Sequence, residues 1–175
     1  MEIGNKLETE RLILRRYKPE DLNDLFEYLS DSEVVKYEPY KAMSLDEVKE
    51  NIEWRMATDE MIAVETKDTH KMIGNIYIAE RDCESFELGY VFNKNYWHKG
   101  YAKESSECVI KEAFAQGAHR IYAECDVANG PSYKLLEAMG FVREAHFKHN
   151  IYFWKDDYGD PIWKDTYVYS LLNED

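Results

Sequence analysis

The chain has 175 residues, of which 45% are hydrophobic and 14% aromatic, so it can bury one core and is too apolar to be disordered. Against 22 Lys and Arg it carries 35 Asp and Glu, a net charge of −13. This charge argues against a protein that binds nucleic acid or an anionic membrane through a basic face, and it favours a cationic partner such as an amine. An acidic surface that only keeps the protein in solution is an equal alternative.

Location and metal content are also constrained by the sequence. No run approaches the roughly 18 apolar residues that a membrane span requires. The first residues, MEIGNKLETERL, are acidic where a signal peptide has a basic and then an apolar region. The three cysteines Cys83, Cys108 and Cys125 have no spacing typical of a metal site. We therefore expect a cytoplasmic protein with reduced thiols and no metal.

The first half of the chain predicts one strand, two helices and an antiparallel meander. Alternation predicts a strand over 11–17, and Pro19 with two following acids opens a helix that ends near Leu29. The capping box Ser44-Leu45-Asp46-Glu47 opens a second helix. A hydrophobic period of two then predicts strands over 61–66, 71–82 and 86–92.

The second half predicts helices that alternate with strands. A helix runs from about Ala102 to Gly117, and another opens at Asn129-Gly130-Pro131 and is capped by Gly140. Strands are predicted over 119–127, 141–154 and 162–172. The order indicates one mixed α/β domain over 1–175, with a sheet that is antiparallel at first and parallel around the two later helices.

Three segments carry residues suited to chemistry. The loop Trp97-His98-Lys99-Gly100-Tyr101-Ala102 turns directly into a helix, whose free N–H groups and dipole favour a pyrophosphate, although a glycine there is also an ordinary cap. Gly89 inside a strand predicts a bulge, which would splay the strand and expose its backbone to an extended ligand. Asn129 and Ser132 suit helix caps, but they also follow the carboxyl end of a strand, where ligands bind.

Together these segments resemble the GNAT (Gcn-related N-acetyltransferase) superfamily, and within it the ribosomal-protein N-acetyltransferase-like branch. The likeness runs from about Leu7 to Leu172, in the segments ETERLILRRYKPEDL, FELGYVFNKNYWHKGYAKES, NGPSYKLLEAMGF and WKDTYVYSLL. It implies an α/β fold with a mixed, twisted sheet of about seven strands and about four helices, and acetyl-CoA as co-substrate.

The resemblance also implies which residues form the site. Backbone groups of His98, Lys99, Gly100, Tyr101 and Ala102 would bind the pyrophosphate, those near Tyr90 and Phe92 would pair with the pantetheine arm, and Asn129 and Ser132 would lie at that arm and the reacting sulfur. Glu87 matches the acidic position of the family's E-x-G-Y pattern and is the candidate base, with a solvated surface glutamate as the alternative. Ser132 is the candidate partner of the CoA thiolate, and a backbone N–H of the splayed strand would stabilise the oxyanion.

Two positions depart from the family pattern. Trp97 stands where the pyrophosphate loop usually begins with Gln or Arg, so one side-chain contact is lost. Leu136 stands where many relatives carry a tyrosine that acts as general acid, so this role is absent or passes to Ser132. Tyr133 points one step around the helix and does not take it over.

Other candidates concern the acceptor. The family builds its acceptor pocket from the first two helices and their connection, which here hold Tyr37, Tyr40 and Trp54; core packing is the alternative for each. Acidic side chains could attract a cationic acceptor or lie on solvated loops, namely Glu33, Glu38, Asp156, Asp157 and Asp160. His146 and His149 are expected on opposite faces of a strand, which argues against a metal pair.

We interpret the chain as an N-acetyltransferase that transfers an acetyl group from acetyl-CoA to a primary amine by direct attack in a ternary complex. The acceptor is a protein N-terminus or a small cationic amine, such as a polyamine or an aminoglycoside. O-acetyl transfer would require a stronger base. Two alternatives outside the class of active enzymes remain. One is an acyl-CoA-binding regulatory module with little turnover, and the other is a homodimer whose aromatic surface binds a partner.

Overall fold

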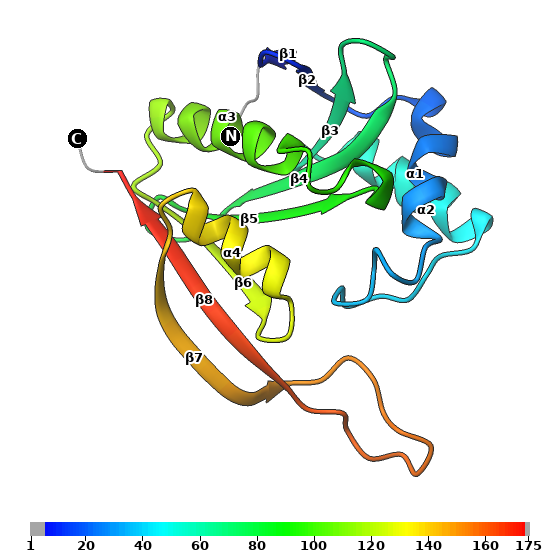
Figure 1. The fold of residues 1–175 in the computed structure, drawn as a ribbon, viewed down its shortest axis with the longest axis vertical. Helices are drawn as coiled ribbons and strands as arrows, with labels where there is room; N and C mark the ends of the chain where they lie inside the picture. The colour runs from blue at the N-terminus through cyan, green and yellow to red at the C-terminus, as the bar shows by residue number, and fades with distance from the viewer. Residues whose placement is uncertain (1–5, 174–175) are drawn as a thin grey trace.

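The computed structural model describes residues 6–173, which form eight strands and four α-helices (Figure 1). The elements in chain order are β1 (Lys6–Glu8), β2 (Leu12–Arg15), η1 (Pro19–Asp21), α1 (Leu22–Leu29), α2 (Leu45–Ala57), β3 (Met61–Thr66), β4 (Met72–Glu80), β5 (Ser85–Phe92), η2 (Lys94–Tyr96), α3 (Tyr101–Ala115), β6 (Arg120–Asp126), α4 (Gly130–Ala138), β7 (Val142–Ile151) and β8 (Lys164–Leu172). The predicted mixed α/β fold with four helices is confirmed. The sheet has one strand more than predicted, because Lys6–Glu8 pairs with β2.

The strands form one sheet in the order β1-β2-β3-β4-β5-β6-β8-β7. Among the strands of residues 6–173, only β5 and β6 pair in parallel, and α3 connects them. The prediction of parallel pairing around both later helices is therefore wrong for α4. This helix connects β6 to β7, but β8 lies between these two strands and is antiparallel to both. Long-range pairing of the last strand, which local pattern does not reveal, decides this arrangement.

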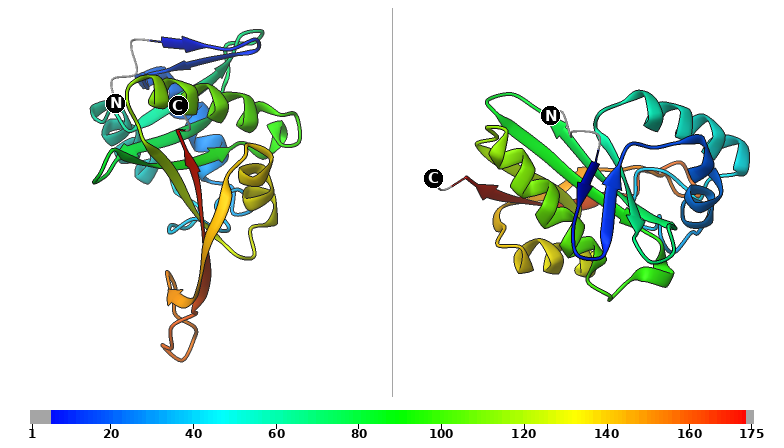
Figure 2. Two further views of the ribbon diagram at one scale, coloured as in Figure 1. Left: turned by 90° about the vertical axis from the view of Figure 1, so that its left-hand side faces the viewer. Right: turned by 90° about the horizontal axis from the view of Figure 1, so that it is seen from above.

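Helices cover both faces of the sheet (Figure 2). Ile62 and Val64 of β3 join the core that lies under α3 and α4, whereas Met61 and Ala63 join the core under α1 and α2. Successive side chains of a strand point to opposite faces, so β3 is buried along its whole length. The site therefore rests on a three-layer scaffold.

Local signals set most helix ends. Ser44 N donates to Glu47 Oε2 at 2.7 Å and Glu47 N donates to Ser44 Oγ at 3.4 Å, which confirms the predicted capping box. Gly100 and Gly117 bound α3 with left-handed φ values of 82° and 96°. The helix predicted from Pro19 instead begins with a 3-10 turn, and the α-helix starts at Leu22.

The sheet splits beyond Glu87. β5 pairs with β6 only from Ser85 to Glu87, but with β4 in one continuous register up to Phe92. β6 in turn stays paired with β8 throughout. The predicted splay is present, whereas the bulge predicted at Gly89 is not, because the β4–β5 register has no shift there. β5 and β6 separate because β5 stays paired with β4 and β6 stays paired with β8.

β7 and β8 form an arm that extends from the body of the protein (Figure 1). Nearly all of β7 is exposed. The prediction that His146 and His149 lie on opposite sides is wrong, because both imidazoles approach Asp165, with Nε2–carboxylate distances of 2.8 and 3.9 Å. The register shifts between Phe147 and Ile151, and His149 has a φ of 47°. Within residues 6–173, no helix is long and apolar enough to cross a bilayer.

Candidate functional site

A cleft of about 930 Å³ opens where β5 and β6 separate. Its walls are the second half of β5, the second half of β6, the first turns of α3 and α4, the loop around Tyr37, the end of β7 and the start of β8. Ten of the predicted site residues line it, namely Tyr37, Glu87, Tyr90, Phe92, His98, Gly100, Tyr101, Ala102, Asn129 and Ser132. The fold thus gathers most of the predicted site in one cavity.

Three predicted site residues lie elsewhere. Lys99 turns back into its own loop, where its ammonium donates to the Asn95 carbonyl at 2.9 Å. Tyr40 packs against the core of α1 and α2. Trp54 is half-exposed and lines a separate hollow beside Thr58, so the structure does not bring it to the cleft.

The start of α3 forms one end of the cleft. Gly100 precedes the helix, and Glu104 N donates to its carbonyl at 3.0 Å, so the N–H groups of residues 101–103 lie in the first turn, where a helix has no carbonyls to pair them. Lys103 lines the cleft in this turn. Free N–H groups, the helix dipole and Lys103 suit a pyrophosphate. Lys103, rather than Lys99, is thus the lysine that this loop and helix present to the cleft.

Arg11 holds this loop in place, and the sequence analysis missed it. Its Nη1 donates to the Lys99 carbonyl at 2.9 Å, its Nη2 lies 2.6 Å from Glu104 Oε2, and its guanidinium lies 4.4 Å from the centre of the Tyr101 ring. The partners are about 90 residues away along the chain, so no local pattern reveals them.

β5 offers free backbone groups to the cleft. Asn93 N donates to the Ile73 carbonyl and Arg81 N donates to the Ser85 carbonyl, so the odd-numbered residues of β5 bond toward β4. The alternation of a strand then turns the N–H and C=O groups of Leu88 and Tyr90 toward β6. The last parallel pair, Glu87 with Tyr122, uses the Leu88 N–H, so the Leu88 carbonyl and both backbone groups of Tyr90 face the gap.

The loop before α3 is tied to the end of β5. The carbonyl of Phe92 accepts a hydrogen bond of 2.8 Å from Trp97 Nε1. Trp97, which replaces the usual polar residue of the family pattern, therefore fixes the loop against the strand. With Phe92 bound in this way, Leu88 and Tyr90 are the β5 residues best placed to pair with an extended ligand.

The first turn of α4 closes the other side of the gap. Asn129 caps the helix, because its Oδ1 accepts from Ser132 N at 3.3 Å. Tyr90 reaches across from β5, and its hydroxyl lies 3.1 Å from both Oγ and the carbonyl oxygen of Ser132. Leu136 is buried and brings no hydroxyl, and Tyr133 packs edge-on against Tyr167 at 5.8 Å between ring centres.

Carboxylates face the cleft from both sides of the gap. Glu87 Oε2 accepts from Arg81 Nε at 3.1 Å and Nη2 at 2.8 Å. Burial and the charge of Glu87 raise the pKa of Glu124 on β6. Burial raises the pKa of Glu38 to about 7, although Tyr40 and Arg55 favour its charged form. A carboxyl group that titrates near neutral pH suits proton transfer.

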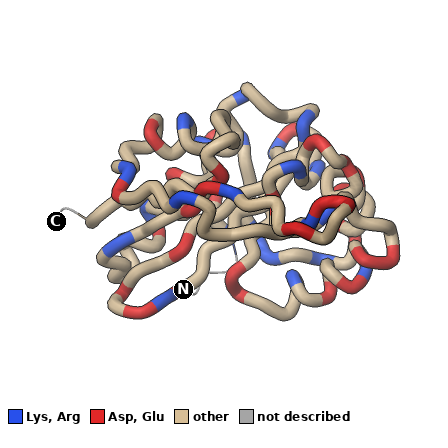
Figure 3. Tube along the Cα trace, turned by 90° about the horizontal axis from the view of Figure 1, so that it is seen from below, with Lys and Arg blue, Asp and Glu red and all other residues tan. Residues whose placement is uncertain are grey.

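The cleft carries more acidic than basic groups. Its acids are Glu33, Glu38, Glu87, Glu124, Asp126 and Asp165, and its bases are Lys36, Lys103 and Lys164. Three of these acids are paired with a cation: Asp126 with Lys164, Glu87 with Arg81 and Glu33 with Lys94. Asp and Glu are otherwise spread over the chain (Figure 3). The remaining acids, Glu38, Glu124 and Asp165, are the groups of the cleft that suit a cationic ligand.

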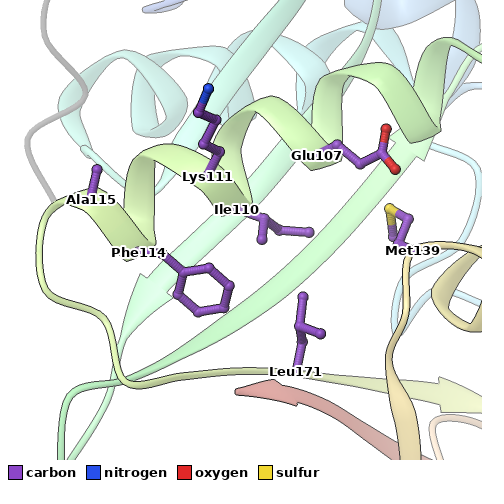
Figure 4. Close-up of a pocket in the computed structure, with 7 residues that line it drawn as sticks. All are labelled: Glu107, Ile110, Lys111, Phe114, Ala115, Met139 and Leu171. Atoms are coloured by element: carbon purple, nitrogen blue, oxygen red, sulfur yellow. The ribbon is translucent and has the colours of Figure 1, made fainter. Parts of the chain in front are cut away.

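A second hollow of about 390 Å³ lies between α3, the end of α4 and β8 (Figure 4). Its floor is apolar, formed by Ile110, Phe114, Met139 and Leu171, and Glu107 and Lys111 stand at its rim. It brings together no set of polar groups comparable to that of the large cleft, so it is the weaker candidate for catalysis.

Comparison with known proteins assigns the fold. The family model "Acetyltransferase (GNAT) domain" matches residues 11–142. The uncharacterized N-acetyltransferase YnaD of Bacillus subtilis is 34% identical over 170 residues, covering 95% of this chain and 96% of that protein. The crystal structure of a GNAT-family acetyltransferase from Bacillus anthracis superposes with a TM-score of 0.88 at 32% identity, covering 97% of this chain and 99% of the other.

More distant structures share the fold. The ribosomal-protein-S5-alanine acetyltransferase of Vibrio fischeri has a TM-score of 0.75 at 24% identity, covering 98% of each chain. The spermidine N-acetyltransferase of Vibrio cholerae, solved with CoA and spermine, has a TM-score of 0.77 at 20% identity, covering 94% of this chain and 96% of the other. With the family model spanning residues 11–142 and relatives that match nearly end to end, the chain is an acetyltransferase that belongs to the GNAT family.

Proposed function

We propose that the protein transfers an acetyl group from acetyl-CoA to a primary amine by direct attack in a ternary complex. The observation that carries this proposal is the cleft between β5 and β6, which has at one end a helix start suited to an anion and carboxylates at the other. A donor laid along β5 would place its pyrophosphate at α3 and its thioester near Ser132. The acceptor would enter between the loop around Tyr37 and the β7–β8 arm.

The chemistry requires few groups. Holding the amine and the thioester in line lowers the barrier by several kcal/mol. The free N–H of Tyr90 would stabilise the oxyanion that forms when the amine attacks the carbonyl. The C–S bond then breaks, its electron pair goes to sulfur, and the Ser132 hydroxyl would donate a hydrogen bond to the thiolate.

Two carboxylates are candidates for the base that takes the ammonium proton. Glu87 lies on β5 beside Leu88, and Arg81 holds its Oε2. Glu38 lies on the acceptor side of the cleft, and its pKa of about 7 suits a base at neutral pH. A pH–rate profile distinguishes the two.

The acceptor side favours an amine with more than one positive charge. The acids in the cleft would draw such a molecule in and hold the part that does not react. A small polyamine and the free N-terminus of a basic peptide both present this chemistry.

The first experiment is a calorimetric titration with acetyl-CoA of the wild type, Gly100→Glu and Gly117→Glu. Both glycines have a positive φ, so both substitutions strain a helix end, but only Gly100 lines the cleft. We expect micromolar binding to the wild type and Gly117→Glu, and none to Gly100→Glu.

Turnover is then measured as thiol release with spermine, kanamycin and a basic peptide with a free N-terminus. Release with any of these amines, and mass spectrometric detection of its acetylated product, supports the transfer. A wild type that binds no acetyl-CoA would overturn the proposal.

A further inference from the structure

We propose that the Tyr90 side chain is a positioning residue, whose hydroxyl orients the Ser132 hydroxyl toward the CoA sulfur. This inference rests on the proposed function and adds a role for a side chain that the sequence analysis treated only as backbone. It also identifies what supports the leaving thiolate in a chain that has Leu136 in place of a tyrosine.

The geometry is specific to the split in the sheet. Tyr90 and Ser132 are 42 residues apart, on β5 and α4, and both line the cleft. The Tyr90 hydroxyl lies 3.1 Å from Ser132 Oγ and 3.1 Å from the Ser132 carbonyl oxygen. The phenol therefore spans the gap that the backbones of β5 and β6 leave open.

The hydrogen bond between Tyr90 and Ser132 determines where the single proton of the Ser132 hydroxyl points. When the single proton of the Tyr90 phenol is donated to Ser132 Oγ rather than to the Ser132 carbonyl, Tyr90 holds the hydroxyl from the β5 side. The Ser132 O–H is then free to donate into the cleft. A hydroxyl fixed in this way loses little rotational freedom when the sulfur becomes negative, so its hydrogen bond strengthens in the transition state.

Tyr90 is suited to orient rather than to supply the proton. Burial raises the pKa of Tyr90 well above its ordinary range, so the phenol stays neutral and remains a donor. A phenol of this kind does not give up its proton to a thiolate, which is the weaker base. The proton that balances the departure of the thiolate comes instead from the acceptor nitrogen through the base and solvent.

The test uses CoA itself and needs no acceptor. If Ser132 donates to the sulfur, the bound thiol has a lowered pKa, and CoA binds more tightly as the pH rises through the thiol range. Desulfo-CoA lacks the sulfur, so the ratio of the CoA affinity to the desulfo-CoA affinity cancels the titration of protein groups such as Cys125, which lines the cleft. In the wild type, we expect the affinity for CoA relative to that for desulfo-CoA to rise several-fold between about pH 7 and pH 9.5.

Four variants define the contact. Ser132→Ala should abolish the rise, and Tyr90→Phe should remove more than half of it. The double variant should behave as Ser132→Ala alone, because Tyr90 acts through Ser132. Tyr169→Phe is the matched control, since the Tyr169 hydroxyl also ties the sheet to α4, through Glu137 at 2.8 Å, but neither residue lines the cleft. It should keep the wild-type rise.

The outcomes separate this inference from the proposed function. If the wild type binds neither ligand, the proposed function falls and this inference falls with it. If CoA binds and Tyr90→Phe keeps the full rise, only the role of Tyr90 is overturned. If Tyr169→Phe loses the rise as Tyr90→Phe does, the contact only anchors α4, and the positioning role is overturned. Once an acceptor is known, Tyr90→Phe should lower kcat about tenfold and leave KM for acetyl-CoA within about twofold.

Discussion

Arg11 and Glu104 form an ion pair that joins the segment before β2 to the first turn of α3, with 2.6 Å between Nη2 and Oε2. Glu104 Oε1 also accepts from Arg11 N at 2.9 Å. The same guanidinium binds the Lys99 carbonyl, so one side chain fixes both the loop and the helix that would hold the pyrophosphate. Residues outside the cleft thus set the geometry of the end that suits an anion.

Arg11→Met should weaken the binding of acetyl-CoA about tenfold, because the loop from His98 to Gly100 loses its anchor. Calorimetry with acetyl-CoA measures this change. The control is Arg16→Met, which removes an exposed ion pair with Asp59 away from the cleft and should leave the affinity unchanged. Equal affinities of the two variants would contradict the role given to Arg11.

The base can be identified from the pH dependence of kcat/KM. If Glu38 accepts the proton, kcat/KM rises about tenfold per pH unit below pH 7 and levels off above it, because the carboxyl must be ionised to act. Glu38→Gln should remove this inflection. Glu33→Gln is the control, since Glu33 lies on the same loop and is bound to Lys94 at 3.3 Å. An inflection that survives in Glu38→Gln and disappears in Glu87→Gln would assign the base to Glu87.

The buried ion triad of Arg15, Asp21 and Glu65 should dominate stability near the N-terminus. Arg15 binds both oxygens of Asp21 at 2.7 and 2.8 Å and Glu65 Oε2 at 2.7 Å, and all three side chains are largely buried. Arg15→Met leaves Asp21 buried without its cation and leaves Glu65 with only Lys18 and His70, which should lower the free energy of unfolding at pH 7 by about 3 kcal/mol. Urea unfolding measures this, with Arg16→Met as the exposed control.

The triad also predicts a pH dependence. Burial opposes the ionisation of Glu65, but hydrogen bonds from His70 and Arg15 outweigh it and lower the pKa of Glu65 below its ordinary 4.5. A carboxyl with a lowered pKa stabilises the fold above that ordinary value, and this stabilisation is lost as the pH falls below it. The difference between the wild type and Arg15→Met should therefore shrink below about pH 4. A constant difference would contradict this account.

Ser106 offers a stabilising substitution. Its side chain is fully buried in α3, and its Oγ has no hydrogen-bond partner within residues 6–173. Ser106→Ala removes this unpaired hydroxyl and introduces a better helix former, so the free energy of unfolding should rise by about 1 kcal/mol. Ser105→Ala is the matched control, because the equally buried Ser105 Oγ donates to the Tyr101 carbonyl at 2.8 Å. A stabilisation of equal size in both variants would show that helix propensity alone is responsible.

Several features of this protein are determined by its sequence alone. The capping box at Ser44, the ends of α3 at Gly100 and Gly117, and the loop that leads into α3 depend on hydrogen bonds and backbone angles within a few residues. Such local preferences act wherever the segment lies in the fold. The resemblance of whole segments to the GNAT pattern then identified the family, which the comparisons confirmed.

Only the tertiary structure decided the rest. The insertion of β8 between β6 and β7, the Tyr90–Ser132 contact and the anchor at Arg11 all join segments that are distant in the chain. Trp54 is an aromatic residue on the second helix, where the family builds its acceptor pocket, yet this helix turns the side chain away from the cleft. Periodicity tells which face of an element is apolar, but not which strand it pairs with, because pairing is chosen by the burial and hydrogen bonding of the complete sheet.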